Sequence, residues 1–189
     1  MLKAKSLYHL IVYSIFFIII LISFFTFIII NNAHEELQEK ITTLKEDYTN
    51  NQKALLKNYV NYVVKFIDYY YIENRDKFDE KTNKKNLILA LDHLNISSNP
   101  NEYIFIFDIN GNLIDNSNDK QEIGKNFLNY KDSKGKNVVK ELIEASKNSD
   151  GGFVNYFWSK PSLTKETNKI SYVKSYDRWS WTIGKGVYL

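Results

Sequence analysis

The side chains best suited to binding a small molecule lie beyond residue 100, where aromatic and polar residues alternate along expected β-strands. Residues two positions apart share one face of a strand, so each of these strands presents an aromatic face. Recognition of a small carboxylate needs a cation or several hydrogen-bond donors, with aromatic walls that exclude water. Lys174 would supply the charge. The candidate ligand-binding residues are Tyr103, Phe105, Asp115, Tyr156, Trp158, Tyr172 and Lys174.

A purely structural interpretation of the same residues stays open. Strand aromatics commonly form a core rather than a pocket. Lys174 could reach solvent along its apolar stem, and Asp115 could be an ordinary turn residue. We interpret Trp179 and Trp181 as structural, holding the last hairpin over the core.

Other chemistry has little support in the sequence. The chain has no cysteine, which excludes disulfides, thiolate metal sites and cysteine nucleophiles. Its three histidines are far apart, and the three aspartates between residues 108 and 119 lack the spacing of a calcium-binding loop. The net charge of +3 is too small to indicate nucleic-acid binding. We expect no catalytic residues, no metal and no cofactor.

An uncharged apolar stretch covers residues 10–30. As a helix it would be about 31 Å long, which matches the thickness of a bilayer core. The stretch is longer than the apolar part of a signal peptide and lacks a small-residue cleavage pattern. Lys3 and Lys5 precede it, whereas the first acidic residue, Glu35, follows it. The positive-inside bias therefore places residues 1–9 in the cytoplasm and the rest outside a bacterial cytoplasmic membrane.

Residues 31–76 predict one long signalling-type helix with apolar residues at spacings of three and four. Before Gln52 the apolar stripe is narrow, as in the seam of a two-helix coiled coil. After Gln52, residues such as Val60, Val63 and Ile67 add a second apolar face that we expect to be buried against a domain. Two interpretations remain: a parallel homodimer stalk that transmits a signal, or a single helix folded along its own domain.

Residues 77–189 predict an α+β domain. All glycines fall between Gly111 and Gly186, so turns and strands concentrate in this part. Asn110-Gly111 is a strong hairpin signal, and most strands are joined by short turns, which favours an antiparallel sheet of about five strands. We expect helices at 80–94 and 137–147, and strands at 103–108, 112–115, 153–159, 169–176 and 180–187.

Four stretches, in this order, resemble the single Cache domain, a PAS-like extracytoplasmic sensor of bacterial receptors. The first is the aromatic strand 103–108 with its Asn110-Gly111 turn, and the second is the loop containing Ile123-Gly124-Lys125-Asn126 and Gly135-Lys136. The third runs from Gly151 to Pro161, and the fourth covers 171–189. Many relatives carry a His-Pro pair after the first hairpin, where this chain has Asp115-Asn116-Ser117.

The resemblance implies a sensor rather than an enzyme. Such domains bind small organic molecules, often short carboxylates, and belong to chemoreceptors, histidine kinases or cyclic-dinucleotide enzymes. These receptors continue through a second membrane helix to an output domain, so we expect the sequence ending at Leu189 to be a sensor excerpt or a truncated receptor. The alternative is a membrane-tethered structural or adhesion protein that acts through its coiled-coil-like helix.

Overall fold

The computed structural model describes residues 2–94, 101–160 and 166–189. Its contacts divide the chain into two compact units, Met1–Tyr48 and Thr49–Leu189. Helix α1 (Leu2–Asn74) forms the described part of the first unit and also begins the second.

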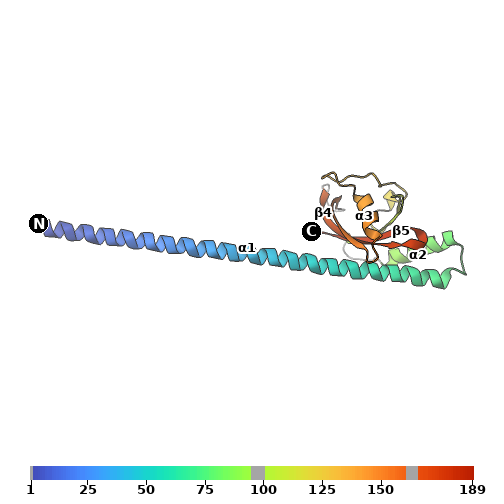
Figure 1. The fold of residues 1–189 in the computed structure, drawn as a ribbon, viewed down its shortest axis with the longest axis horizontal. Helices are drawn as coiled ribbons and strands as arrows, with labels where there is room; N and C mark the ends of the chain where they lie inside the picture. Colours follow the sequence, from blue (N-terminus) through green and yellow to red (C-terminus); the bar gives the residue numbers. More distant parts are fainter. Residues whose placement is uncertain (1, 95–100, 161–165) are drawn as a thin grey trace. The chain divides into compact units, whose positions relative to one another are not determined.

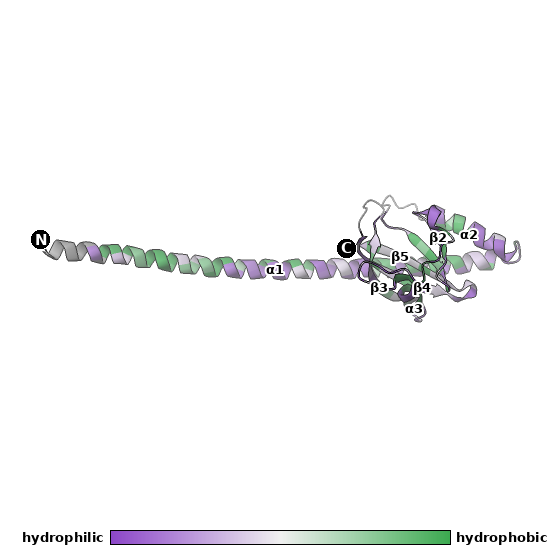
Figure 2. Cartoon of the chain, turned by 90° about the horizontal axis from the view of Figure 1, so that it is seen from above, coloured by the Kyte–Doolittle hydropathy of each residue, from purple (hydrophilic) through white to green (hydrophobic). Residues whose placement is uncertain are grey.

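The first unit carries the apolar stretch predicted from the sequence. Large apolar side chains between Ile11 and Ile30 are exposed, and the most apolar window of the helix has a mean hydropathy of 2.8. Figure 2 shows hydrophobic residues concentrated there and mostly hydrophilic ones in the following turns. Among the described residues, α1 is the one helix long and apolar enough to cross a membrane, which agrees with the predicted membrane helix.

The second unit is built on an antiparallel sheet with the strand order β2-β1-β5-β4-β3. Hairpins join β1 to β2, β3 to β4 and β4 to β5, whereas helix α3 lies on the connection between β2 and β3. The strands are β1 (Ile104–Asp108), β2 (Leu113–Asn116), β3 (Gly152–Ser159), β4 (Glu166–Tyr176) and β5 (Trp181–Tyr188).

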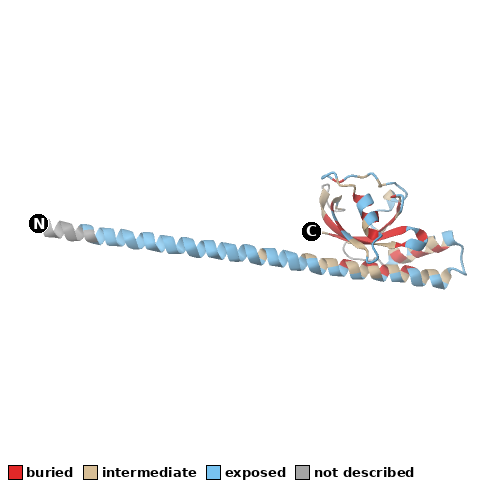
Figure 3. Ribbon diagram, viewed as in Figure 1, coloured by how far each residue is buried: buried red, intermediate tan, exposed pale blue. Residues whose placement is uncertain are grey.

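Two separate hydrophobic cores lie on the two faces of the sheet. On one face, helix α2 (Glu80–Leu94) and the α1 residues of this unit pack against alternate strand residues such as Ile106 and Ile183. On the other, α3 (Val138–Ser146) packs against the opposite set, including Phe105 and Val173. Figure 1 shows the sheet between these helices, and Figure 3 shows the buried residues along the strands and on the sheet-facing side of α1.

The β1–β2 turn shows why the sequence folds this way locally. The Asp108 carboxylate accepts hydrogen bonds from the backbone N–H groups of Asn110 and Asn112 at 2.9 and 2.8 Å. Gly111 has φ +81°, and a Cβ there would lie 2.7 Å from the Leu128 Cβ. Glycine is therefore required both by the backbone conformation and by the approach of Leu128.

These elements confirm the predicted α+β class and the five-stranded antiparallel sheet, with strand ends shifted by at most three residues. Val60, Val63 and Ile67 are buried, which confirms the second apolar face of the long helix. Trp179 and Trp181 lie in the core on the α1 and α2 side, as predicted. The predicted chain break at 97–100 and the loop from Pro161 fall outside the described residues.

Candidate ligand-binding cavity

A cavity of about 640 Å³ lies on the α3 face of the sheet. Its floor comes from strand residues and its walls from α3 and the connection between β2 and α3. One part of the lining is aromatic and apolar, and the other is polar. The lining residues are Tyr103, Phe105, Phe107, Leu113, Asn116, Asn118, Asp119, Glu122, Phe127, Tyr130, Leu142, Tyr156, Trp158, Ser159, Lys160 and Lys169.

The described lining contains two lysines, Lys160 and Lys169. Lys169, on β4, is almost fully buried, with 1% of its surface exposed. Glycine on the neighbouring strand makes room for it. Gly186 pairs with Ser171, and a Cβ on Gly186 would lie 2.5 Å from the Lys169 Cε and would collide with the Ser171 Oγ. Gly184 likewise leaves space for the Phe105 ring. The floor of the cavity thus depends on two missing side chains.

Aromatic rings surround the Lys169 ammonium. Its Nζ lies 3.9 Å from the centre of the Tyr103 ring, 4.9 Å from that of Tyr188 and 5.8 Å from that of Phe105. Among the described residues, no carboxylate lies within ion-pair distance of this ammonium. Burial alone lowers the pKa of Lys169 to about 7, because the charged form loses its hydration without gaining a counter-charge.

Tyrosine hydroxyls add hydrogen-bonding groups beside Lys169. The Tyr156 hydroxyl lies 2.8 Å from the Ser171 hydroxyl, and the Tyr103 hydroxyl lies 3.5 Å from that of Tyr188. Burial raises the pKa of Tyr103 and Tyr156 well above the usual tyrosine value. Both phenols are therefore neutral at physiological pH and can donate a hydrogen bond to an anion.

The apolar wall is a cluster of aromatic side chains. Tyr130 and Trp158 meet edge to face with ring centres 4.9 Å apart, and Phe127 lies 6.3 Å from Trp158. The Tyr130 hydroxyl donates a hydrogen bond to Glu166 at 2.8 Å. Burial, together with this bond, raises the pKa of Tyr130 to about 12. This wall is held in place by contacts outside the cavity and supplies an apolar surface for a ligand.

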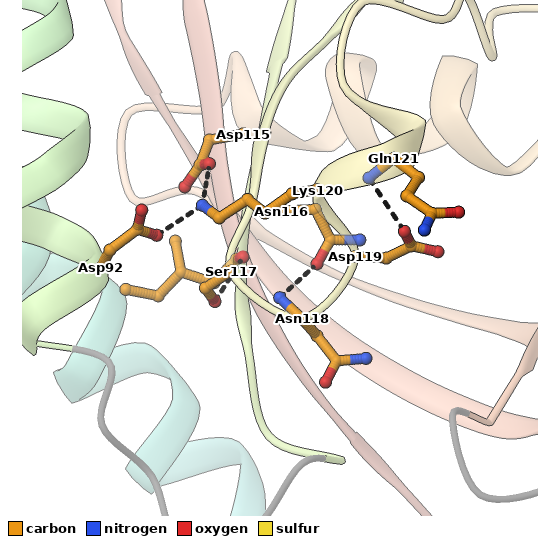
Figure 4. Close-up of polar contacts among 9 residues, drawn as sticks. Asp92, Asp115, Asn116, Ser117, Asn118, Asp119, Lys120 and Gln121 are labelled. Atoms are coloured by element: carbon orange, nitrogen blue, oxygen red, sulfur yellow. Dashed lines mark hydrogen bonds and ion pairs between the residues drawn. The ribbon is translucent and has the colours of Figure 1, made fainter.

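Residues 116–122, which we call the rim segment, supply most of the polar lining. Within it the Asn116 side chain accepts a hydrogen bond from the Asn118 N–H at 3.0 Å, and Asp119 accepts one from the Gln121 N–H at 3.1 Å. Figure 4 shows these local bonds, which fix the fold of the segment. The rim segment is thus shaped by its own short polar side chains.

Lys120 anchors the rim segment to the rest of the domain. Its ammonium lies 2.7 Å from the Asp115 carboxylate and 2.6 Å from that of Asp92 on α2 (Figure 4). Asp115 is buried, with 1% exposed. Burial raises the pKa of Asp115, and the hydrogen bond from Lys120 only partly offsets that effect. The bridge therefore connects a buried carboxylate, the rim segment and a helix on the opposite face.

The structure brings together four of the seven candidate residues. Tyr103, Phe105, Tyr156 and Trp158 line the cavity, whereas Asp115, Tyr172 and Lys174 are absent from its described lining. Asp115 pairs with Ile106 on the other face of the sheet, and its neighbour Asn116 faces the cavity instead.

The predicted position of Lys174 at the cavity is wrong, because the other set of alternate residues in β4 faces the cavity. Ile170, Tyr172 and Lys174 do share one face, but it is the face toward α1. The Lys174 ammonium donates to the Asn61 side chain of α1 at 3.2 Å, and the Tyr172 hydroxyl donates to the backbone carbonyl of Asp150. The cavity face of β4 carries Lys169 and Ser171.

Register explains which lysine faces the cavity. Tyr156 pairs directly with Lys169 in the antiparallel ladder, and paired residues lie on the same face of a sheet. The β3 and β4 strands pair symmetrically about the connection between Ser159 and Glu166. Folding the predicted strands 153–159 and 169–176 about the middle of their connection would pair Tyr156 with Tyr172 instead, because β4 begins three residues earlier than predicted, at Glu166. The rim segment carried no comparable signal.

The lining combines lysine, hydroxyl and amide groups with the two carboxylates of Asp119 and Glu122. Within residues 2–94, 101–160 and 166–189, no group of three or more His, Asp or Glu side chains gathers in a metal-binding arrangement.

Two known proteins of bacterial signalling are similar in sequence to this chain. The chain is 30% identical over 152 residues to the sensor histidine kinase MctS of Rhizobium johnstonii, a match that covers 80% of this chain and 32% of that protein. It is also 30% identical over 88 residues to the methyl-accepting chemotaxis protein McpP of Pseudomonas putida, covering 47% of this chain and 16% of McpP. The chain thus spans a third or less of these curated relatives.

A solved relative has the same fold. A Cache chemosensory domain studied for carboxylic acid recognition superposes with a TM-score of 0.67 at 25% identity, covering 76% of this chain and 97% of that one. The family model for single Cache domain 2 matches residues 48–189. This match extends over most of the chain and includes every strand of the sheet, so the chain belongs to the single Cache domain 2 family.

Proposed function

We propose that this chain is the sensing part of a bacterial transmembrane receptor and that it binds a small carboxylate in the cavity on the α3 face. The observation that carries the proposal is the buried Lys169 ammonium, which has no carboxylate partner among the described residues. Burying an unpaired cation is costly, so a ligand anion is a natural counter-charge. The solved Cache domain associated with carboxylic acid recognition supports the same ligand class.

In the proposed complex, the ligand carboxylate contacts Lys169 and accepts hydrogen bonds from tyrosine hydroxyls. Tyr103 and Tyr156 are the nearest such donors, and both are neutral at physiological pH. Phe105 and Trp158 provide apolar contacts for the rest of the molecule. The single positive charge of Lys169 at the floor of the cavity favours a ligand with one negative charge over a ligand with two.

Strand β4 offers a route from the cavity toward the membrane helix. One face of the strand carries Lys169 and Ser171, and the other carries Tyr172 and Lys174, which contact the α3–β3 turn and α1. At the same turn, Asp150 accepts a hydrogen bond from Lys57 of α1 at 2.5 Å. A shift of β4 on ligand binding would therefore change contacts with α1 directly.

We place residues 1–9 in the cytoplasm, residues 10–30 in the membrane and the sensor domain outside it, on the charge distribution described above. The output domain of the receptor would be a methyl-accepting, kinase or cyclase domain. The relatives MctS and McpP show that chains matching this one occur in both histidine kinases and chemotaxis receptors.

Isothermal titration calorimetry of the full chain in lipid nanodiscs tests the binding proposal, with acetate, propionate and benzoate as probes. We expect at least one probe to bind, and Lys169→Met to weaken its binding at least about tenfold, which corresponds to about 1.4 kcal/mol. Lys174→Met is the matched control, since Lys174 lies on the same strand with its side chain on the other face.

Two results would contradict the proposal. Equal loss of binding in both lysine variants would show that the cavity is not the site. Absence of binding by all three probes would favour the alternative function, a membrane tether that acts through its long helix.

The outer face of α1 suggests a homodimer. Leu55, Tyr62 and Tyr69 recur every seven residues and are 55%, 59% and 64% exposed, a spacing typical of a coiled-coil seam. We propose that a second copy of the chain covers this stripe. Because the chain has no cysteine, Tyr62→Cys should form a disulfide-linked dimer on oxidation, whereas cysteine at the exposed Asp68, about 120° around the helix from Tyr62, should not.

A further inference from the structure

The cation in the cavity is enclosed on the protein side by groups that carry no negative charge. The rings around the Lys169 ammonium belong to Tyr103 before β1, Phe105 on β1 and Tyr188 on β5. Tyr156, its cross-strand partner on β3, bonds to the Ser171 hydroxyl. Among the described residues, a proton on Lys169 is therefore not held by a protein counter-ion.

The remaining charged groups of the lining are on the rim and across the cavity. They are Asp119 and Glu122 of the rim segment and Lys160 at the end of β3. Glu122 already pairs with Lys125 at 2.6 Å, and Asp119 accepts the Gln121 N–H. Tyr130, which is titratable like Tyr103 and Tyr156, donates to Glu166. Neither Asp119 nor Glu122 forms an ion pair with the Lys169 ammonium in the described structure.

We propose that carboxylate binding in this cavity is coupled to proton uptake by Lys169, so that the sensor responds jointly to ligand concentration and to external pH. The proposal rests on the proposed function. An anion beside Lys169 replaces the missing counter-charge, and the lysine of the complex is then protonated even where that of the free protein is largely neutral. Binding draws the proton from solvent to the lysine Nζ.

The direction and size of the effect follow from the pKa of Lys169, which burial lowers to about 7 in the free domain. Below that pH the lysine is already charged, and affinity changes only about twofold between pH 6 and 7. Above pH 7, the fraction of the protein in which Lys169 is protonated and able to bind the anion falls. Affinity should weaken about fivefold between pH 7 and 8, and about tenfold between pH 8 and 9, as long as the complex keeps its proton.

Calorimetry in buffers of different ionisation enthalpy measures the number of protons taken up. With propionate as the probe and the full chain in nanodiscs, we expect uptake of about 0.1 proton at pH 6, about 0.5 at pH 7 and about 0.9 at pH 8. Lys174→Met should reproduce these values. Lys169→Met should show no uptake in whatever binding it retains.

A titration of the ligand-free protein gives an independent test. The Cε signal of Lys169, labelled with ¹³C and assigned by its loss in Lys169→Met, should titrate near neutral pH rather than near 10. Titration near 10 would overturn the coupling whether or not a ligand binds.

The outcomes separate this inference from the proposed function. Propionate binding with no proton uptake between pH 6 and 8 overturns the coupling and leaves the carboxylate sensor standing. If neither propionate nor the other two probes bind, the proposed function and the coupling fail together.

Discussion

The two faces of the sheet serve different ends although they are made by alternate residues of the same strands. The face toward α1 and α2 is closely packed with large apolar side chains such as Ile106, Trp181 and Ile183. The face toward α3 keeps a cavity of about 640 Å³ and buries a lysine within it. One face stabilises the domain, whereas the other gives up packing and solvation energy around the proposed binding site.

This contrast indicates how a sensor can be stable and responsive at once. Loss of packing on the α1 and α2 face should reduce stability without altering the site, and changes at the cavity should alter binding or titration more than folding. Strand β4 connects the two faces most directly, because its Lys169 lines the cavity while its Lys174 bonds to Asn61 of α1. Mutations on each face of the sheet can therefore test this difference directly.

The largest effect should follow from Ile67→Ala on the packed face. Ile67 of α1 is fully buried, and truncating such a side chain costs about 2–5 kcal/mol of unfolding free energy through lost burial and the cavity left behind. Urea unfolding of the full chain in micelles measures it. The exposed Glu73→Ala on the same helix should change stability by less than about 0.5 kcal/mol. Weaker propionate binding by the folded Ile67→Ala protein would contradict the separation of the two faces.

A smaller loss should follow from Gly186→Ala on the cavity face. The new Cβ would press on the Lys169 Cε at 2.5 Å and on the Ile170 carbonyl oxygen at 3.0 Å, and overpacking of this kind costs about 1–3 kcal/mol. Displacement of the lysine should also shift its ¹³Cε titration and weaken propionate binding.

Gly184→Ala is the matched comparison for that variant. It lies two residues away on the same strand face but collides with the Phe105 ring and with Val173. It should lose similar stability while shifting the titration of Lys169 less than Gly186→Ala does, because the Phe105 ring that it displaces lies 5.8 Å from the ammonium. If both variants shifted the titration equally, the space over Gly186 would not be specific to the lysine.

A pH dependence of stability follows from the same lysine. Because burial lowers the pKa of Lys169 to about 7 in the folded state from 10.5 when unfolded, the unfolded chain binds the extra proton between these values. The stability of the ligand-free domain should therefore rise from about pH 7 toward 10.5, by up to about 1.4 kcal/mol per pH unit, with the full cost of the buried charge remaining below pH 7.

Lys169→Met isolates this contribution. The variant should be more stable than the wild-type protein at pH 6, and the difference should shrink as pH is raised from 7.5 to 9. Urea midpoints at a series of pH values measure it, with Lys174→Met as control. A constant difference across that range would show that Lys169 does not titrate there.

The sequence predicted the elements of the fold better than the site. Hairpin signals such as Asn110-Gly111 and the alternation of aromatic residues are local, and they identified the antiparallel sheet and the cavity face of β1 and β3. Alternation alone cannot decide which face of β4 joins them, because that depends on the register between strands. The sequence pattern favours Lys174, which shares a strand face with Tyr172, whereas the register of the sheet pairs Lys169 with Tyr156.

Asp115 shows a second kind of limit. Its position at the end of a strand was predicted correctly, yet an irregularity in the β1–β2 ladder between Ile106 and Phe107 changes which face its side chain occupies. The ion pair with Lys120 and Asp92 joins segments distant in sequence, and such contacts depend on the tertiary fold. The polar lining of the rim segment could not be predicted for the same reason.

The rim segment is fixed largely by hydrogen bonds within itself and by the single lysine that reaches Asp115 and Asp92. Its side chains, that lysine included, belong to neither hydrophobic core in the described structure. Mutations at Asn118 or Glu122, whose side chains do not make these internal bonds, can therefore accumulate during evolution at little cost to folding. A lineage could change the molecules it detects by altering these few positions while inheriting the helix-packed face, and with it the connection to the membrane, unchanged.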